Sequence, residues 1–172
     1  MKTLIIVPAY NEEQSLKRVI DHLCEVCPQY DYLIINDGST DRTKEICMEN
    51  GYHVMNLPEN QGLTHAIQTG MRYALAQDYD AAIQFDADGQ HLPEYIQDMV
   101  TFMEESDCDI VIASRFKGVK MPFRLRTLGG KMISAAIWLT TGQKLTDPTS
   151  GMRLYGREII RLFAKDFHHT PE

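Results

Sequence analysis

The sequence predicts an α/β protein with a mostly parallel sheet and helices on both of its faces. Three observations carry this prediction: short apolar runs without polar alternation, helical patterns between the runs, and polar residues directly after several runs. Apolar runs of this kind are typical of parallel strands that are buried on both faces. Strands that alternate with helices form βαβ units, so we expect the runs to lie side by side in one sheet.

Each expected element has a local justification. Apolar, largely β-branched runs predict strands over residues 3–7, 32–35, 53–56, 81–85 and 110–113, of which 53–56 is the weakest. Amphipathic patterns predict helices over residues 12–26, 41–50, 63–76, 93–105 and 157–165. Ser39 or Thr40 together with Asp41 forms a cap region for the second helix, and Gly51 ends it.

Composition limits the functional classes. The chain has 172 residues, of which 44% are hydrophobic and 24% charged, as expected for one globular domain. The net charge of −7 argues against a nucleic acid as partner. No signal peptide precedes the first expected strand, and no apolar run is long enough to span a bilayer. These features predict a cytoplasmic protein.

The pair Asp86 and Asp88 is the most informative feature, because it follows an apolar run directly. In an extended segment the side chains at i and i+2 point the same way, so both carboxylates can reach one cation. Oxygen ligands favour a hard ion such as Mg²⁺ or Mn²⁺. Two further Asp-x-Asp pairs precede their runs instead: Asp78 with Asp80, and Asp107 with Asp109. Ligands of open α/β sheets bind at the carboxyl ends of strands, so these two pairs are expected to be solvated carboxylates at the opposite edge.

Polar residues follow other strands too. The segments 8–12, 36–41, 86–90 and 114–115 all come directly after an expected strand. Parallel strands bring their carboxyl ends to one edge, so we expect these four segments to line one crevice.

Six blocks of the sequence resemble those of the family 2 glycosyltransferases, and in particular the polyprenyl-phosphate (dolichol-phosphate mannosyltransferase-like) subgroup. They occur in the family's order: Pro8-Ala9-Tyr10-Asn11-Glu12, Asn36-Asp37-Gly38-Ser39-Thr40-Asp41, Asn60-Gln61-Gly62, Asp86-Ala87-Asp88-Gly89-Gln90-His91, Ser114-Arg115-Phe116 and Asp147-Pro148-Thr149-Ser150-Gly151-Met152-Arg153. The resemblance implies a single GT-A catalytic domain over residues 1–172. It also implies a nucleotide-diphospho-sugar donor, UDP- or GDP-linked, a divalent cation, and transfer with inversion at the anomeric carbon.

The resemblance assigns roles at the donor side. Pro8, Tyr10 and Glu12 would line the base and ribose pocket, and Asp37 would grip the nucleoside, since a carboxylate accepts hydrogen bonds from base N–H groups or ribose hydroxyls. Tyr10 could instead simply cover the strand end.

Asp86, Asp88 and Gln90 would surround Mg²⁺ or Mn²⁺, which would bridge the donor diphosphate and act as a Lewis acid. Gln90 could instead cap the following helix. His91 lies beside this group and is a weaker candidate for a direct contact.

The resemblance also assigns roles at the reaction centre. Arg115 would face the anionic phosphates, and Asp147 is the candidate catalytic base, unless Asp147 only forms a turn with Pro148. A saccharide acceptor needs such a base, whereas a lipid phosphate is already anionic.

Residues 115–146 carry seven basic and no acidic side chains, and include the apolar stretch 132–139 with the single tryptophan. This pattern suits either a membrane interface that meets polyprenyl phosphate on the inner face, or an ordinary core helix after a cationic loop. Members of the subgroup often carry an arginine where this chain reads Gly129-Gly130-Lys131, which weakens the acceptor assignment.

The remaining expectations concern the alternatives and the extent of the chain. A sugar-phosphate nucleotidyltransferase would open with a glycine-rich loop after the first strand, and residues 8–12 offer none. A non-catalytic nucleotide-binding module is the third interpretation. Relatives generally continue beyond the helix over 157–165, so the chain is expected to be C-terminally incomplete, and a homodimer is one way to cover exposed apolar surface. We expect a role in the biosynthesis of cell-envelope glycans.

Overall fold

The computed structural model describes residues 1–113 and 151–165. One sheet carries β1 (Thr3–Ala9), β2 (Asp31–Asn36), β3 (Val54–Asn56), β4 (Ala81–Gln84), β5 (Ile110–Ile112) and β6 (Arg153–Gly156) in the order β3-β2-β1-β4-β6-β5. Strands β3, β2, β1 and β4 pair in parallel, and β6 lies antiparallel between β4 and β5. The prediction of a mostly parallel sheet is confirmed.

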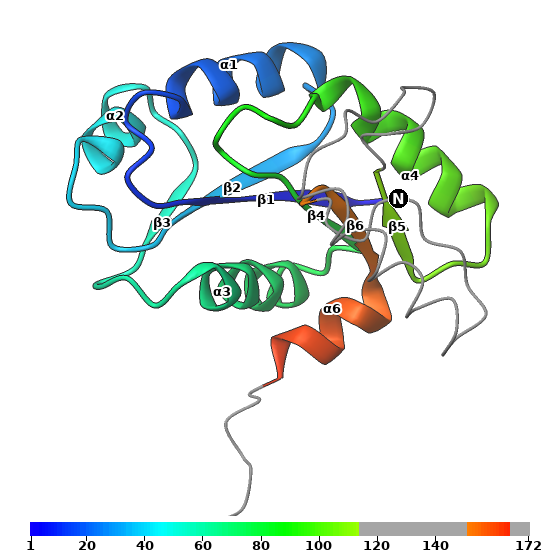
Figure 1. Cartoon of the computed structure of the whole chain (residues 1–172). Coiled ribbons are helices and arrows are strands. Elements are labelled where there is room, and N and C mark those ends of the chain that lie inside the picture. The colour runs from blue at the N-terminus through cyan, green and yellow to red at the C-terminus, as the bar shows by residue number, and fades with distance from the viewer. Residues whose placement is uncertain (114–150, 166–172) are drawn as a thin grey trace, which may run out of the picture.

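Helices cover both faces of the sheet, as predicted (Figure 1). They are α1 (Leu16–Val26), α2 (Thr43–Glu49), α3 (Leu63–Ala76), the 3-10 turn η1 (Pro93–Tyr95), α4 (Ile96–Glu105) and α6 (Arg157–Ala164). Helices α1, α2 and α4 lie on one face, and α3 and α6 lie on the other. No helix within residues 1–113 and 151–165 is long and apolar enough to cross a membrane.

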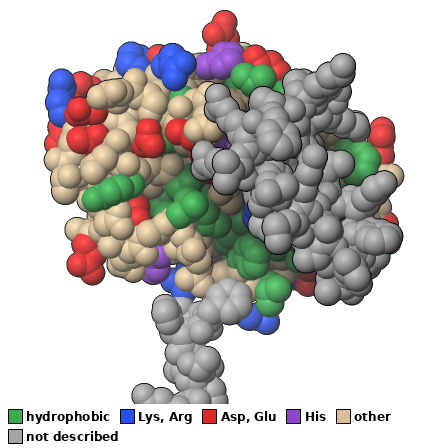
Figure 2. All heavy atoms as spheres, in the orientation of Figure 1, with side chains coloured by type: hydrophobic (Ala, Val, Ile, Leu, Met, Phe, Trp, Pro, Cys, Tyr) green, Lys and Arg blue, Asp and Glu red, His purple; other side chains and the backbone are tan. Residues whose placement is uncertain are grey.

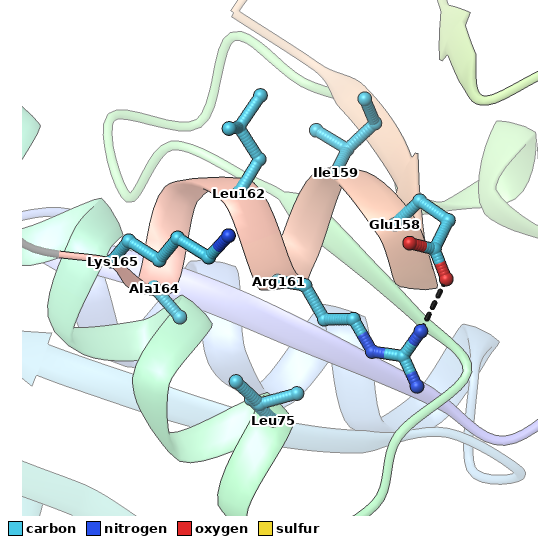
Figure 3. Close-up of a pocket in the computed structure, with 7 residues that line it drawn as sticks. All are labelled: Leu75, Glu158, Ile159, Arg161, Leu162, Ala164 and Lys165. Atoms are coloured by element: carbon cyan, nitrogen blue, oxygen red, sulfur yellow. Dashed lines mark hydrogen bonds and ion pairs between the residues drawn. The ribbon is translucent and has the colours of Figure 1, made fainter.

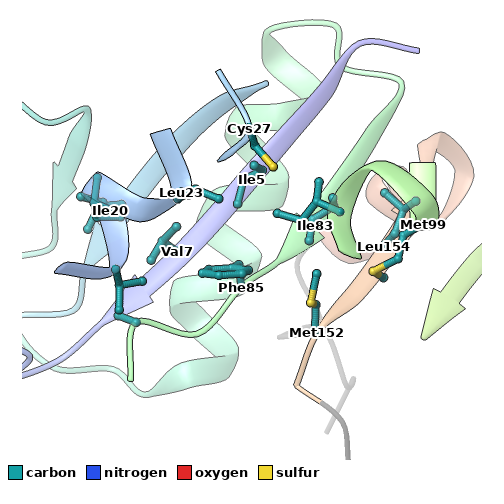
Figure 4. Close-up of a cluster of buried hydrophobic side chains, with 14 of the residues drawn as sticks. Ile5, Val7, Ile20, Leu23, Cys27, Ile83, Phe85, Met99, Met152 and Leu154 are labelled. Carbon is teal, nitrogen blue, oxygen red and sulfur yellow. The ribbon is translucent and has the colours of Figure 1, made fainter. Parts of the chain in front are cut away.

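The side chains of β1 show why its sequence does not alternate. Ile5 and Val7 pack in the layer under α1 and α4 (Figure 4), whereas Leu4 and Ile6 pack in the layer over α3 and α6. Both faces of the strand are therefore buried, which favours a continuous apolar run. Helix α3 approaches closely at Gly70, where a Cβ would collide with the side chain of Ile6.

The element boundaries differ from the predictions in a few places. The first helix begins at Leu16 rather than residue 12, because residues 13–15 form turns. The second begins at Thr43, whose N–H donates to Asp41 Oδ1 (2.9 Å), and Gly51 follows its end with φ of +66°, as expected. Strand β6 was not predicted, and it makes the sheet mixed. The apolar stretch 132–139 lies outside the described residues.

Candidate donor and metal site

A cleft of about 320 Å³ lies at the carboxyl ends of β1, β2 and β4. It is lined by Pro8, Ala9, Tyr10, Glu12, Asp37, Asn60, Gly62, Leu63, Ala66, Asp86, Ala87 and Asp88. Three strand ends and the start of α3 thus contribute to one hollow. Three of the four strand ends that were predicted to line one crevice meet here, and the cleft holds six of the predicted site residues, whereas residues 114–115 lie outside the described residues.

Asp37 anchors the far wall of the cleft. Its side chain follows β2 and is only 3% exposed, and its two oxygens accept the N–H groups of Gln61 (2.9 Å) and Gly62 (2.8 Å). Gly38 has φ of +64°, and a Cβ there would lie 2.7 Å from Glu59 Cα. The carboxylate and the close backbone approach therefore hold the loop before α3 against the end of β2.

The loop that carries Tyr10 and Glu12 is tied to the loop after β2. Asn11 adopts φ of +56°, and its Oδ1 accepts the N–H of Thr40 (2.8 Å) while its own N–H donates to Ser39 Oγ (3.0 Å). The N–H of Glu12 donates to the hydroxyl of Thr43 at the start of α2 (2.8 Å). The two loops therefore form one hydrogen-bonded unit, from which Tyr10 presents a half-exposed ring to the cleft.

Asp86 and Asp88 reach the cleft from a turn, not from an extended segment as expected. Strand β4 ends at Gln84, residues 87 and 88 lie in a turn, and Gly89 follows with φ of +78°. Both carboxylates nevertheless line the same cleft. Asp88 accepts the N–H of Gln90 at Oδ1 (2.9 Å) and the amide Nε2 of Gln90 at Oδ2 (2.8 Å). Gln90 thus contacts Asp88 and does not itself line the cleft.

The carboxylate oxygens of the cleft suit a hard divalent cation whose other coordination positions are filled by a bound ligand. Asp86 and Asp88 offer carboxylate oxygens, and among the described residues no group of three or more His, Cys, Asp and Glu side chains could cage a metal. Mg²⁺ and Mn²⁺ are commonly held by one or two carboxylates, with substrate phosphates and water in the other positions. The residues present fit this kind of ion.

Two further residues lie next to Asp86: His91, which we named as a weaker candidate for a direct metal contact, and Gly151, which we did not assign to the site. His91 is buried, and its Nδ1 accepts the N–H of Asp86 (3.1 Å). Gly151, which precedes β6, lies so close that a Cβ would collide with Asp86 Oδ2 and would lie 2.8 Å from His91 Cε1. The only local signal for Gly151 was its place inside the last of the six blocks.

The other Asp-x-Asp pairs lie away from the cleft, as predicted. Asp78 binds Arg157 (2.7 Å), and Asp80 accepts the N–H of Lys2 (2.9 Å) beside the start of β1. Asp107 precedes β5 and is exposed. On the face in Figure 2 acidic side chains are dispersed, so position at the strand ends distinguishes the cleft, and surface charge does not.

A second hollow, of about 530 Å³, lies between α3 and α6 (Figure 3). It is lined by Leu75, Glu158, Ile159, Arg161, Leu162, Ala164 and Lys165, and an ion pair joins Arg161 to Glu158. It contains none of the predicted site residues. Although it is larger, its position beside the helices and away from the strand ends makes it the weaker candidate. Arg115 and Asp147 lie outside the described residues, so their roles stay predictions.

The chain resembles known proteins over most of its length. The Glycosyl transferase family 2 model matches residues 4–163. The chain is 30% identical to the polyprenol monophosphomannose synthase of Mycolicibacterium smegmatis, covering 92% of this chain and 63% of the relative. It is also 30% identical to the undecaprenyl-phosphate mannosyltransferase of Micrococcus luteus, covering 96% of this chain and 71% of that protein.

A solved structure has a similar fold. Glucosyl-3-phosphoglycerate synthase from Mycobacterium tuberculosis, in complex with Mn²⁺, UDP-glucose and phosphoglyceric acid, superposes with a TM-score of 0.72 at 22% identity. The superposition covers 92% of this chain and 57% of the synthase. The chain therefore spans less than two thirds of the length of this synthase and of the M. smegmatis relative.

Proposed function

The chain belongs to glycosyl transferase family 2, and we propose that it transfers a sugar from a nucleotide-diphospho-sugar to a polyprenyl phosphate, with inversion at the anomeric carbon. Its fold is GT-A. One observation carries the proposal: Tyr10, Asp37 and the carboxylates Asp86 and Asp88 line the same cleft. A volume of about 320 Å³ is within the range of small-molecule sites.

The cleft residues divide between the two ends of a donor. At the nucleoside end, the ring of Tyr10 offers a flat apolar surface to a base, and Pro8 and Glu12 complete that wall. Each oxygen of Asp37 accepts one backbone N–H and keeps a second lone pair for a base N–H or a ribose hydroxyl. The donor is a UDP- or GDP-sugar in this proposal.

At the diphosphate end, Asp86 and Asp88 would hold Mg²⁺ or Mn²⁺, with Gln90 beside them. The ion, when bound, supplies positive charge that stabilises the departing nucleoside diphosphate. Gln90 orients Asp88 through its two hydrogen bonds, so the carboxylate is preorganised before a ligand arrives. We propose Mn²⁺ for the first tests, because the M. tuberculosis synthase was solved with it.

Two named relatives favour a lipid-phosphate acceptor over a saccharide. The M. smegmatis protein is a polyprenol monophosphomannose synthase, and the M. luteus protein acts on undecaprenyl phosphate. Such an acceptor is anionic at neutral pH and needs positioning more than a base, so Asp147 would not be essential. Within this proposal Arg115 contacts phosphate, and the protein works peripherally at the cytoplasmic face of a membrane. The nucleotidyltransferase alternative is disfavoured by the family.

The test is ligand-dependent thermal stabilisation against UDP, GDP, CDP and ADP, each with and without Mn²⁺. A ligand that binds only the folded state raises the melting temperature once its concentration exceeds Kd. The variant Asp88→Asn removes one carboxylate charge from the cleft. Asp107→Asn makes the same chemical change at an exposed aspartate before β5 and serves as the matched control.

We expect UDP or GDP to stabilise the parent and Asp107→Asn only with Mn²⁺. For Asp88→Asn, the same rise in melting temperature should need at least about a tenfold higher nucleotide concentration. Equal stabilisation of all three proteins would refute the metal role of Asp88. Stabilisation by none of the nucleotides would refute the proposed donor site in this chain. With the donor identified, transfer of labelled sugar to undecaprenyl phosphate tests the acceptor.

A further inference from the structure

His91 is built into the turn that carries the two carboxylates. Its side chain is 5% exposed, and its ring packs edge-on against Phe85, with ring centroids 5.7 Å apart. Nδ1 accepts the backbone N–H of Asp86 at 3.1 Å. The imidazole therefore closes the turn from Asp86 to His91 by a side-chain-to-backbone hydrogen bond, and packing fixes its orientation.

The hydrogen bond at Nδ1 determines what the other ring nitrogen can do. A nitrogen that accepts an N–H carries no proton, so the neutral ring has its proton on Nε2. Nε2 lies 3.7 Å from Asp86 Oδ2, longer than a direct hydrogen bond but on the side of that carboxylate. The ring thus holds the backbone of Asp86 with one nitrogen and faces its carboxylate with the other.

Within residues 1–113 and 151–165, three groups lie close to the carboxylate of Asp86. Oδ1 accepts a long hydrogen bond from Gln84 Nε2 (3.3 Å), and Gly151 lies so close that a Cβ on it would collide with Oδ2 and lie 2.8 Å from His91 Cε1. The side chain of Asp86 remains 30% exposed and lines the cleft. Protein atoms therefore enclose it on the sides of Gln84, His91 and Gly151, and it opens toward the cleft.

We propose that His91 is a positioning residue, which sets the direction of the Asp86 carboxylate for a divalent cation and the diphosphate that it binds. The inference rests on the proposed function, because it concerns a ligand of Asp86 and Asp88. Core packing alone does not need this arrangement, since a leucine or phenylalanine could fill the volume without either nitrogen. Groups that orient a metal ligand typically contribute about 10- to 100-fold to metal affinity.

Two substitutions separate positioning from packing. His91→Asn keeps an acceptor near the position of Nδ1 for the N–H of Asp86, but it lacks the Nε2–H donor. His91→Phe keeps the ring volume and loses both nitrogens. His22→Asn makes the first change at an exposed histidine on α1, where it contacts Glu94, and is the control. The measurements are the melting temperature without metal and Mn²⁺ affinity, by electron paramagnetic resonance with saturating nucleotide.

We expect His91→Asn to melt near the parent and to bind Mn²⁺ about 10- to 100-fold more weakly. His91→Phe is expected to lose both stability and affinity, and His22→Asn neither. Nitrogen NMR of the metal-free parent, assigned with His91→Asn, should show the Nε2–H tautomer. The role of His91 would be refuted if a folded His91→Asn bound Mn²⁺ with the affinity of the parent, or if the parent showed the Nδ1–H tautomer. Either result would leave the proposed function intact.

The failure of the proposed function gives a different result. In that case the parent binds no Mn²⁺ with any nucleotide, and Asp88→Asn behaves like the parent. The assignment of His91 then falls together with that of the cleft.

Discussion

Replacing Gly151 with alanine should disable the cleft while leaving the protein folded. A Cβ at this position would collide with Asp86 Oδ2 and would lie 2.8 Å from His91 Cε1 and 3.2 Å from Asp86 Cγ. Comfortable carbon–carbon contact needs about 3.5 Å, so the ring must retreat by about 0.7 Å and the nearer carboxylate oxygen by about 1 Å. The carboxylate is the end of a short side chain, so it can move without displacing the backbone.

The consequence for binding follows from that displacement. A misplacement of about 1 Å at a reacting or binding group costs on the order of 100-fold, whereas overpacking costs about 1–3 kcal/mol of stability. We therefore expect Gly151→Ala to unfold cooperatively and to lose about 100-fold in Mn²⁺-dependent nucleotide affinity. Isothermal titration calorimetry with the nucleotide selected by thermal stabilisation measures the affinity, and urea denaturation measures the stability.

Gly156→Ala is the matched control, because it makes the same change at the other end of β6. A Cβ at Gly156 would meet nothing nearer than 3.4 Å, and φ there is −74°. This variant should bind nucleotide like the parent. A folded Gly151→Ala with nucleotide affinity within twofold of the parent would refute the close approach of Gly151 to Asp86 as we describe it.

Three further predictions concern stability and reactivity. Gly70→Ala should destabilise the protein, because a helix-propensity gain of about 1 kcal/mol is smaller than the cost of the collision with Ile6. In the double mutant, Ile6→Ala should relieve that collision. If the free energies of unfolding from urea denaturation were additive, the collision would be contradicted. Burial raises the pKa of the Cys47 thiol to about 11, so at pH 8 a thiol reagent should label exposed Cys24 first and Cys47 only on unfolding, as peptide mass spectrometry would show. Burial alone would raise the pKa of Asp41, but hydrogen bonds from the hydroxyl and N–H of Thr43 and from the N–H of Glu13 outweigh it and lower that pKa. The stability that Asp41 contributes is therefore fully present above pH 3.8, the pKa of the unfolded state, and is lost as the pH falls through the lower pKa of the folded state. The difference in urea midpoint between the parent and Asp41→Ala should therefore shrink below pH 3.8.

The gathering of the cleft residues could be predicted because it depends only on strand direction. Tyr10, Asp37 and Asp86 each follow a parallel strand, and the register of β1 with β2 and β4 brings those ends together. The same argument assigned Asp78 and Asp107 to the other edge. No knowledge of side-chain conformation was needed.

The features that were missed depend on contacts between distant residues or on turn geometry. Strand β6 has four residues, too few for a period-two pattern, and its pairing with β4 joins residues about seventy positions apart. The bond from Asp86 to His91 depends on a turn that no hydrophobic periodicity records. The extended conformation assumed for Asp86 and Asp88 was wrong, because residues 87 and 88 lie in a turn, which Gly89 follows with a positive φ.

The hydrogen bonds of Asn11 have a consequence for redesign. Because its side chain and backbone join the loop after β1 to Ser39 and Thr40, the nucleoside wall is shaped before any ligand arrives, and binding should order little of it. Substituting Tyr10 should then change how strongly a base is held without reshaping the wall. Replacing only one of these loops with that of a relative that uses another donor should not transfer the donor preference. Both loops would have to be exchanged together.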